Sequence, residues 1–600
     1  MDSTLQRFGR LFVAALAAAA SLAGLPAQAY NHTRIVNPIP AGRFAVACSN
    51  IAQDTSRMIA GSNPSDYWEG RRVDGAERYI SEILSAPQTA LRFNVHVPDR
   101  RALYPGHFDQ DVVFVAIVCH PTPRTNSDPE YVLPGSGDVV PHMVPAGGAP
   151  KLVSAAEYAS TLGIQAIGDP AQPAQLPTIA FSHGLTGSPI SKGYIDAMVQ
   201  LAAQGYLVGA VFHGDPRFSR VRVEDLDDFV FLLTNFDRVV EMQLMRPISV
   251  SAMLDTLLAH PGYSAAIDRS RIGGFGASMG GEAMTLLAGA HLTSTIGGHC
   301  EDNPGVADPR FRAFVGYVPY AGYSFLPAFC LDQRGADFVD RPYLAISGTS
   351  DTTAPAGLMR QALERFNNTR YMVELEGGQH ELRPEDQGDL FTWMVNFFNA
   401  YMDVRGDPGA MARFIRMKGV VGGREDTLTI DVHVPFPLAP GEIAVREFYN
   451  PIVNHYFMTA DPAEIARIER GDAGAGWEAT GLFVKAWPQM PSDTFTPVAP
   501  VCLFYGKYRG GAVSHFYTAS SAECELTKAN RGWNFVGNPF FIVPAANGTC
   551  PDGYLGVNRA YNNGFVRNDD NHRYSTSDSE IREMERTGWT AESTVMCMRP

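Results

Sequence analysis

Short apolar segments alternate with helical patterns between residues 176 and 375, and this alternation constrains the fold more than any other feature of the sequence. The predicted strands span residues 178–181, 206–212, 271–275, 314–318, 343–347 and 371–375, and earlier strand-like runs occupy 91–97 and 112–118. Helical patterns over 194–202 and 282–287 follow two of these strands. Buried strands joined by helices form a mostly parallel sheet flanked by helices, so we predict an α/β fold here.

The last 155 residues contain a threefold internal repeat with a period of 56 residues. Its markers are two aromatic columns, Tyr449, Tyr505 and Tyr561, and Trp477, Trp533 and Trp589. Between them we align His455-Tyr456-Phe457, His515-Phe516-Tyr517 and His572-Arg573-Tyr574. Each unit is predicted to form two strands, a short helix and a third strand, and is too small to fold alone. The aromatic columns either pack inside this small β-rich domain or stack on a carbohydrate or surface ligand.

The domain organisation follows from these two patterns, because 600 residues exceed what one hydrophobic core supports. We predict an α/β domain over residues 30–418, a connection rich in glycine and proline over 419–445, and the three-repeat module over 446–600. An acid-rich amphipathic segment at 217–245 interrupts the strand–helix rhythm. It is interpreted either as a lid over a site or as an ordinary surface helix.

The first 29 residues have the pattern of a secretory signal peptide. Arg7 and Arg10 give a positive start, an apolar run follows, and Ala27-Gln28-Ala29 offers a cleavage site before Tyr30. The apolar run of about 15 residues is shorter than the roughly 20 that span a bilayer. We therefore expect a secreted protein, extracellular or periplasmic, with no membrane span.

Eight cysteines fit an exported protein. They are Cys48, Cys119, Cys300, Cys330, Cys502, Cys524, Cys550 and Cys597. None lies in a C-x-x-C pair, which gives no support to a metal or thiol-redox motif, and an even count favours disulfides. We predict pairing of neighbours in order, although sequence alone leaves the connectivity open and free buried thiols are the alternative. The formal net charge of −15 disfavours nucleic acid as a partner.

Gly276-Ala277-Ser278-Met279-Gly280 matches the pattern G-x-S-x-G at a predicted strand-to-helix turn. We expect the strand to end at Phe275 and the helix to begin just past Gly281. Flanking glycines permit the tight turn that exposes a nucleophilic serine at the sheet edge. A phosphate-binding loop is excluded because the glycine spacing is wrong and no lysine follows.

A serine nucleophile needs a base and an acid, which in this architecture follow on loops after later strands. Asp351 and His380 stand at those positions, after the strands at 343–347 and 371–375. Weaker candidates are Glu376 and Asp332 for the acid and His291 and His299 for the base. The backbone N–H groups of Leu185 and Met279 are the predicted oxyanion hole, and His183 is interpreted as a structural hydrogen-bonding residue.

A family resemblance follows from four segments, Phe181-Ser182-His183-Gly184-Leu185-Thr186-Gly187-Ser188, Val211-Phe212-His213-Gly214-Asp215, Arg246-Pro247 and the glycine-flanked turn around Ser278. Over residues 170–400 the chain resembles platelet-activating-factor acetylhydrolases and the related bacterial dienelactone-hydrolase-like proteins. The resemblance implies an α/β-hydrolase fold and hydrolysis of short or modified acyl esters without metal or cofactor. Ala277 and Met279 depart from the histidine and phenylalanine that this family often has, which affects the acyl pocket.

We therefore expect a serine hydrolase that cleaves small-molecule or polymeric carboxylic esters through Ser278, Asp351 and His380. The repeats resemble a three-repeat module attached to secreted proteins and hydrolases. Two alternatives stay open: a binding or adhesion protein with a non-catalytic hydrolase scaffold, and an amidase or peptidase on the same fold.

Overall fold

The computed structural model describes residues 39–599 with gaps. The gaps fall at 70–77, 167, 220–233, 301–305, 324–325, 367, 376, 382–383, 403–425, 432–437, 439–440, 451, 492–497, 508–512, 552–553, 565–569, 577–580, 582–583 and 586–587. The predicted signal peptide, residues 220–233 of the acid-rich segment and the candidate acid Glu376 therefore lie outside the described residues.

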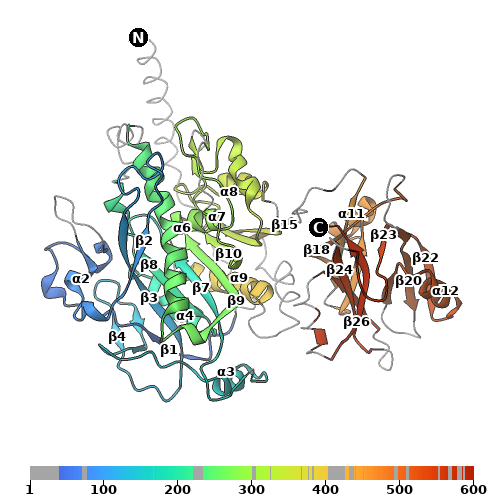
Figure 1. Cartoon of the computed structure of the whole chain (residues 1–600), viewed down its shortest axis with the longest axis horizontal. Helices are drawn as coiled ribbons and strands as arrows, with labels where there is room; N and C mark the ends of the chain where they lie inside the picture. The colour runs from blue at the N-terminus through green and yellow to red at the C-terminus, as the bar shows by residue number, and fades with distance from the viewer. Residues whose placement is uncertain are drawn as a thin grey trace, which may run out of the picture. The chain divides into compact units, whose positions relative to one another are not determined.

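A large mixed sheet forms the centre of the first domain (Figure 1). Its eleven strands, within the described residues, are β1 (Ala45–Cys48), β2 (Leu91–His96), β3 (Asp111–Thr122), β6 (His142–Met143), β7 (Leu176–Ser182), β8 (Leu207–Phe212), β9 (Ile267–Ala277), β10 (Phe311–Tyr317), β13 (Tyr343–Gly348), β14 (Arg370–Leu375) and β15 (Asp426–Asp431). The order is β15-β14-β13-β10-β9-β7-β8-β3-β1-β6, with β2 paired to β3. The six strands from β14 to β8 run parallel, whereas β15, β3, β2 and β1 pair antiparallel.

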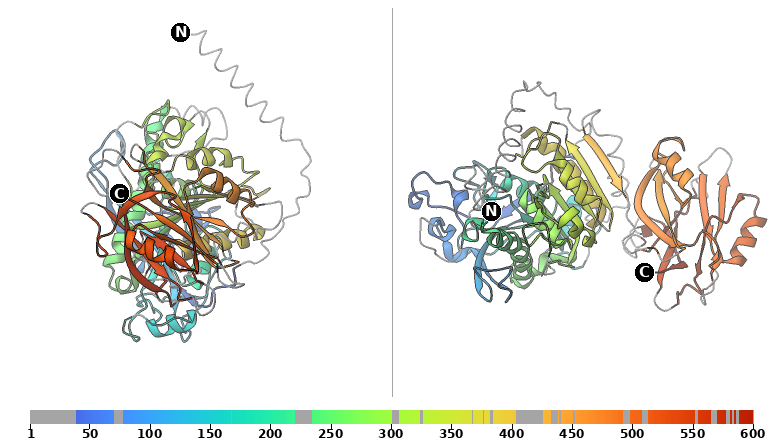
Figure 2. Two further views of the ribbon diagram at one scale, coloured as in Figure 1. Left: turned by 90° about the vertical axis from the view of Figure 1, so that its right-hand side faces the viewer. Right: turned by 90° about the horizontal axis from the view of Figure 1, so that it is seen from above.

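Helices cover both faces of this sheet (Figure 2). On one face lie α6 (Phe236–Ala259), α7 (Met279–Leu287) and α8 (Ala356–Leu363), and on the other α4 (Tyr194–Ala203) and α9 (Pro384–Met402). Strand side chains alternate between the two layers: Tyr343 and Ala345 join the first core, and Leu344 and Ile346 join the second. The prediction of an α/β architecture is confirmed at this level.

Short elements complete the first domain. They are α2 (Ile80–Ile83), α3 (Ala155–Leu162), the strands β4 (Tyr131–Val132), β5 (Val139–Val140), β11 (Gly322–Tyr323) and β12 (Leu326–Pro327), and the 3₁₀ turns η1 (Thr55–Arg57), η2 (Pro64–Asp66), η3 (Pro87–Thr89), η4 (Asp215–Arg217), η5 (Ser264–Ala266) and η6 (Leu331–Phe338). Strand β15 lies inside the segment that we predicted to be a connection, and it extends the large sheet by pairing with β14.

The turn around Ser278 is tighter than the sequence predicts. The strand continues two residues past Phe275 to Ala277, and α7 begins directly after Ser278 rather than beyond Gly281. Gly276 and Gly280 lie inside β9 and α7, where they allow backbone atoms to pack closely, and they do not end the strand or the helix. A Cβ atom on Gly276 would lie 2.1 Å from the Gly280 carbonyl oxygen, and one on Gly280 would lie 1.9 Å from the Ser182 carbonyl oxygen.

The C-terminal region forms small β sheets. The first unit has β16 (Ile443–Asn450), β17 (His455–Thr459), α11 (Pro462–Glu469) and β18 (Glu478–Ala486), and the second has β20 (Cys502–Lys507), β21 (Val513–Thr518), α12 (Ser521–Ala529) and β22 (Trp533–Gly537). A five-stranded sheet, β19-β23-β26-β24-β25, contains β19 (Ala499–Pro500), β23 (Phe541–Pro544), β24 (Leu555–Tyr561), β25 (His572–Ser575) and β26 (Thr590–Met598). The predicted order of strand, strand, helix and strand is confirmed for the first two units.

The alignment of the second strands was wrong by one residue in the first unit. Tyr449 lies opposite Tyr456, whereas Tyr505 and Tyr561 lie opposite His515 and His572. Tyr456, and not His455, is therefore equivalent to the two later histidines. The error arises because the hairpin loops differ in length, so that the second strands do not keep the period of the first.

Tyrosine hydroxyls join the units through their second strands, which contact one another. The Tyr517 hydroxyl accepts a hydrogen bond from Met458 N at 3.0 Å and donates to Met458 O at 2.6 Å. Tyr574 bonds to the Tyr517 backbone in the same way, with both distances 2.8 Å. Met458 occupies the equivalent position in the first unit and carries no hydroxyl, so two such links form instead of three.

Four disulfides pair the cysteines in the predicted order: Cys48–Cys119, Cys300–Cys330, Cys502–Cys524 and Cys550–Cys597. The first joins directly opposed residues of β1 and β3. In the described part of the chain, no helix combines the length and apolar character needed to cross a membrane.

Candidate active site

Ser278 occupies the sharp turn between β9 and α7 with a backbone φ of 54° and ψ of −119°. A positive φ is strained for a residue with a Cβ atom and persists only where the surroundings fix it. Four backbone hydrogen bonds do so here: Ser278 N donates to Tyr317 O at 2.9 Å, and Ser278 O accepts from Gly281 N at 2.8 Å, Tyr320 N at 3.1 Å and Glu282 N at 3.2 Å. The turn places the side chain at the N-terminus of α7, where the helix dipole favours negative charge.

Ser278, His380 and Asp351 form a continuous hydrogen-bonded chain. Ser278 Oγ lies 2.9 Å from His380 Nε2, and His380 Nδ1 lies 2.8 Å from Asp351 Oδ2. Asp351 is 5% exposed, and its Oδ1 accepts from Thr353 N at 2.8 Å and Ala354 N at 2.9 Å. A carboxylate can only accept, so Nδ1 carries the proton and Nε2 is free to accept from the serine hydroxyl.

The sheet order explains why residues so far apart in sequence meet. Strands β9, β10, β13 and β14 are parallel neighbours, so the loops after them leave the same edge of the sheet. Gly348 and Gly378 let the last two loops pack together, because a Cβ atom on Gly348 would lie 2.2 Å from Gly378 O. The structure thus brings together the three residues that the sequence places after these strands.

The weaker candidates lie elsewhere. Asp332 is exposed on η6, and His299 is exposed in the loop before Cys300. The His291 ring stacks on Phe338 with a centroid distance of 3.9 Å. None of these three contacts Ser278 through a hydrogen bond within the described residues.

Two backbone N–H groups beside Ser278 have no hydrogen-bond acceptor in the described part of the chain: those of Leu185 and Met279. Both residues line the same cleft as Ser278 and His380. A Cβ atom on the preceding Gly184 would lie 3.5 Å from Ser278 Cβ, so this loop packs directly on the serine. Unpaired amides are rare away from water, and a pair aimed near a serine suits a developing oxyanion.

The cleft has a volume of about 910 Å³, which suits a ligand of several hundred daltons. One part of its lining is aromatic or aliphatic: Phe236, Val239, Leu292, Tyr317, Tyr320, Tyr323 and Leu326. Another part is polar: Asp138, Ser191, Lys192, Asp196, Glu381 and Gln387. The volume and the mixed lining accommodate a ligand with an apolar portion and a polar one.

Glu282 is a buried carboxyl group one helical turn after Ser278. It is 0% exposed, and its Oε1 accepts from Gln243 Nε2 at 2.8 Å, while its Oε2 has no hydrogen-bond partner among the described residues. Burial raises the pKa of Glu282 to about 8, an effect that the positive charge of Arg246 partly opposes. The carboxyl group is therefore largely protonated at neutral pH.

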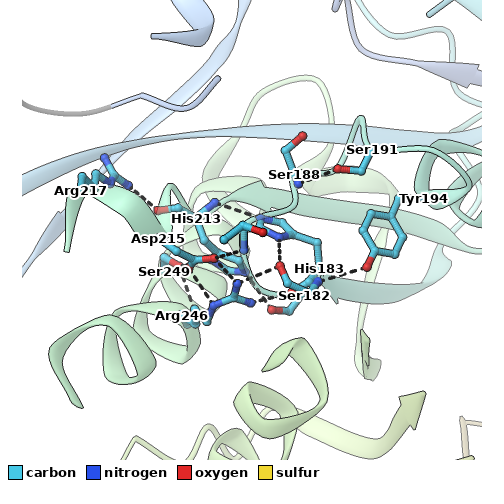
Figure 3. A network of polar contacts seen from close by, with 12 residues as sticks. Ser182, His183, Ser188, Ser191, Tyr194, His213, Asp215, Arg217, Arg246 and Ser249 are labelled. Atoms are coloured by element: carbon cyan, nitrogen blue, oxygen red, sulfur yellow. Dashed lines mark hydrogen bonds and ion pairs between the residues drawn. The ribbon is translucent and has the colours of Figure 1, made fainter. Parts of the chain in front are cut away.

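A buried polar network joins side chains of β7, η4 and α6, among them Ser182, Asp215 and Arg246 (Figure 3). Arg246 of α6, 1% exposed, forms a bidentate ion pair with Asp215, 2% exposed. The same guanidinium donates to His183 O at 2.5 Å and to Gly184 O at 3.0 Å. Sequence reasoning named Arg246 and Asp215 only as parts of family motifs and missed this network.

Two buried histidines extend the network. His213 Nε2 lies 2.8 Å from Ser182 Oγ, and His213 Nδ1 lies 3.1 Å from Ser249 Oγ. His183 is fully buried and engages both ring nitrogens, as predicted for a structural residue. Burial, reinforced by the charge of Arg246, lowers the pKa of His183 to about 4 and that of His213 well below its usual value. Both rings are neutral at physiological pH.

Comparison with known proteins identifies one region. Residues 444–599 match a family model described as a domain of unknown function (DUF5648), which covers about a quarter of the chain. The match coincides closely with the three-repeat module. A search of curated proteins found no match for the chain.

Proposed function

We propose that this protein is a secreted serine hydrolase of the α/β-hydrolase fold that cleaves carboxylic esters. The observation that carries the proposal is the hydrogen-bonded chain from Ser278 through His380 to Asp351, next to two unpaired amides in one cleft. The platelet-activating-factor acetylhydrolase-like segments and the strand order support the fold. The signal pattern and four disulfides support export.

Each group has a definite role in the proposed reaction. His380 Nε2 takes the proton of Ser278 as Oγ attacks the ester carbonyl, and Asp351 stabilises the imidazolium through Nδ1–H. The amides of Leu185 and Met279 bind the oxyanion of the tetrahedral intermediate. Its collapse expels the alcohol, which receives the proton from His380. Water then repeats the sequence on the acyl-enzyme and releases the acid.

Two other functions would make different demands on the same site. An amidase or peptidase would need the same Ser278 chain, and a binding protein would need none of it. The aligned hydrogen bonds among Ser278, His380 and Asp351 favour an enzyme over a binding protein, because a scaffold has no requirement for them. For the repeats, half-buried Trp477, Trp533 and Trp589 pack on neighbouring rings, which favours core packing over a carbohydrate-stacking role.

The test is hydrolysis of p-nitrophenyl esters from acetate to palmitate by the mature protein and by Ser278→Ala. We expect the substitution to reduce turnover by about a thousandfold or more. The acyl chain length that is hydrolysed fastest would indicate the size of the part of the cleft that binds the acyl group. Equal rates for both proteins would rule out Ser278 as the nucleophile, and a wild type inert on every ester but active on amides would favour the amidase.

A further inference from the structure

We propose that Arg246, Asp215 and His183 are positioning residues that fix the orientation of the Leu185 amide. This inference rests on the proposed function, because it concerns the oxyanion hole of that reaction. It assigns a role in transition-state stabilisation to three buried side chains that, within the described residues, do not themselves line the cleft and form no hydrogen bond with Ser278. Figure 3 shows the ion pair between Arg246 and Asp215 with His183 beside it.

The argument begins with the geometry of one peptide unit. The Gly184 carbonyl and the Leu185 N–H belong to the same planar trans peptide, so they point in opposite directions. Fixing the carbonyl oxygen therefore fixes the direction of the N–H. Arg246 Nη2 donates to Gly184 O at 3.0 Å, and His183 Nδ1 lies 2.8 Å from the same oxygen. The carbonyl is held on the α6 side of the loop, and the amide consequently points away from it, toward the cleft that Leu185 lines.

The contact from His183 is a donated hydrogen bond because its tautomer is determined. The His213 backbone N–H donates to His183 Nε2 at 3.3 Å, so Nε2 must be unprotonated. Burial keeps the ring neutral, and the single proton therefore resides on Nδ1. Gly184 O thus accepts a neutral hydrogen bond from His183 and a charge-assisted one from Arg246, and it also accepts from Gly187 N at 3.3 Å within the turn.

Asp215 holds the other end of the same short segment. Its Oδ2 accepts from Thr186 N at 3.1 Å while the carboxylate pairs with Arg246. Thr186 has a φ of 56°, which is unfavourable for a β-branched residue and needs an external constraint. Leu185 is therefore flanked by a fixed carbonyl before it and a fixed amide after it. Its own N–H is the group in this turn that is left for a ligand.

A purely structural role is the competing explanation. A buried ion pair contributes little net stability, and apolar residues of similar volume often replace such pairs without loss. The two explanations therefore predict different results when both charges are removed. An apolar replacement leaves the fold intact in either case, but only the positioning role predicts a selective loss of oxyanion stabilisation.

The experiment compares p-nitrophenyl acetate with its thionoester, in which sulfur replaces the carbonyl oxygen. Sulfur is larger and a poorer acceptor, so the ratio of kcat/KM for oxygen over sulfur substrates reports on the oxyanion hole rather than on folding. The test variant is Arg246→Met/Asp215→Leu, which leaves no unpaired charge. Removing a full oxyanion donor costs about 10²–10³ in kcat. For a misdirected donor we expect kcat on the oxygen ester to fall at least about tenfold, KM to change less than about threefold, and the ratio to fall about tenfold.

Controls separate the possible failures. Arg217→Met removes another buried arginine, which donates to His213 O and stacks on Phe114. In the described part of the chain, Arg217 forms no hydrogen bond with residues 183–186. Arg217→Met should lower the melting temperature without changing the ratio. Arg246→Lys retains the buried charge and provides a second test if the double variant does not fold, and it should also lower the ratio.

Failure of the positioning role can be distinguished from failure of the proposed function. Wild type that neither hydrolyses the acetate ester nor becomes phosphorylated on Ser278 by diethyl p-nitrophenyl phosphate would refute the proposed function itself. An active wild type whose ratio is unchanged in folded Arg246 variants, or falls equally in Arg217→Met, would refute the positioning role.

Discussion

Asp351→Asn tests the hydrogen-bonded chain at its most informative point. Oδ1 of Asp351 accepts from the Thr353 and Ala354 amides, so an asparagine at 351 places its carbonyl oxygen there and turns its NH₂ group toward His380. The NH₂ group can only donate, which forces Nδ1 of His380 to be unprotonated and moves the proton to Nε2. Nε2 then cannot accept the proton of Ser278. The known effect of this wrong tautomer in serine proteases is about 10⁴ in kcat. That loss corresponds to about 5.5 kcal/mol at 1.36 kcal/mol per tenfold change.

The assay is steady-state hydrolysis of p-nitrophenyl acetate with chemical denaturation of the same samples. Because the hydrogen bonds from the backbone amides of Thr353 and Ala354 are retained, we expect the free energy of unfolding to change by less than about 1.5 kcal/mol, the scale of one net hydrogen bond. Asp332→Asn is the matched control, since Asp332 is the exposed alternative acid. A loss of kcat below about tenfold in Asp351→Asn, or an equal loss in Asp332→Asn, would refute the tautomer argument.

Three further predictions concern stability. Glu282→Gln should become more stable relative to wild type as pH rises from 5 to 8. In wild type the pKa of the Glu282 carboxyl is about 8 in the folded protein and near 4.5 in the unfolded chain. The unfolded chain therefore releases the proton first, and the stability of wild type falls across this pH range. Urea midpoints of both proteins at pH 5 and pH 8 measure the difference, and a constant difference would contradict it. Tyr517→Phe removes both hydrogen bonds between the Tyr517 hydroxyl and the Met458 backbone. It should lower the stability of the repeat module by about 1–3 kcal/mol, measured by thermal unfolding. The same substitution at a tyrosine whose hydroxyl does not join two repeat units should cost less. Replacing Cys48 and Cys119 together by serine opens a loop with a sequence separation of 71 and should cost about 2–5 kcal/mol by denaturant titration; an unchanged midpoint would mean that β1 stays paired without the bond.

The sequence predicts the arrangement of Ser278, Asp351 and His380 because each follows a buried strand of one parallel sheet. Strand–helix alternation reveals that sheet, and the parallel rule then places all three loops at the same edge. The sheet's antiparallel members were not predicted as such. Strand β15 was missed because it lies between Gly422-Gly423 and the prolines of residues 435–440, and these local signals favour a connection.

Close packing was the main obstacle to a finer prediction. Gly276 and Gly280 look like chain breakers, but they lie within or beside regular elements because neighbouring backbone atoms leave no space for a Cβ. The contact of Arg246 with Asp215 spans 31 residues, and its contact with Gly184 spans 62, so no local pattern could reveal either. The repeat alignment failed at Tyr456 because hairpin loop lengths vary while the first strands keep their period.

Backbone strain separates the cleft from the repeat module. Among the described non-glycine residues with positive φ, three line the cleft: Thr186, Ser278 and Val318. Those in the repeat module are Asn454, Asn547 and Asn563. Asparagine visits this region readily, whereas threonine, serine and valine do so at a cost of about 1–2 kcal/mol each. Such strain persists only where surrounding contacts fix it, and it clusters at functional sites. The strained residues therefore favour the cleft, rather than the aromatic columns of the repeat module, as the functional site.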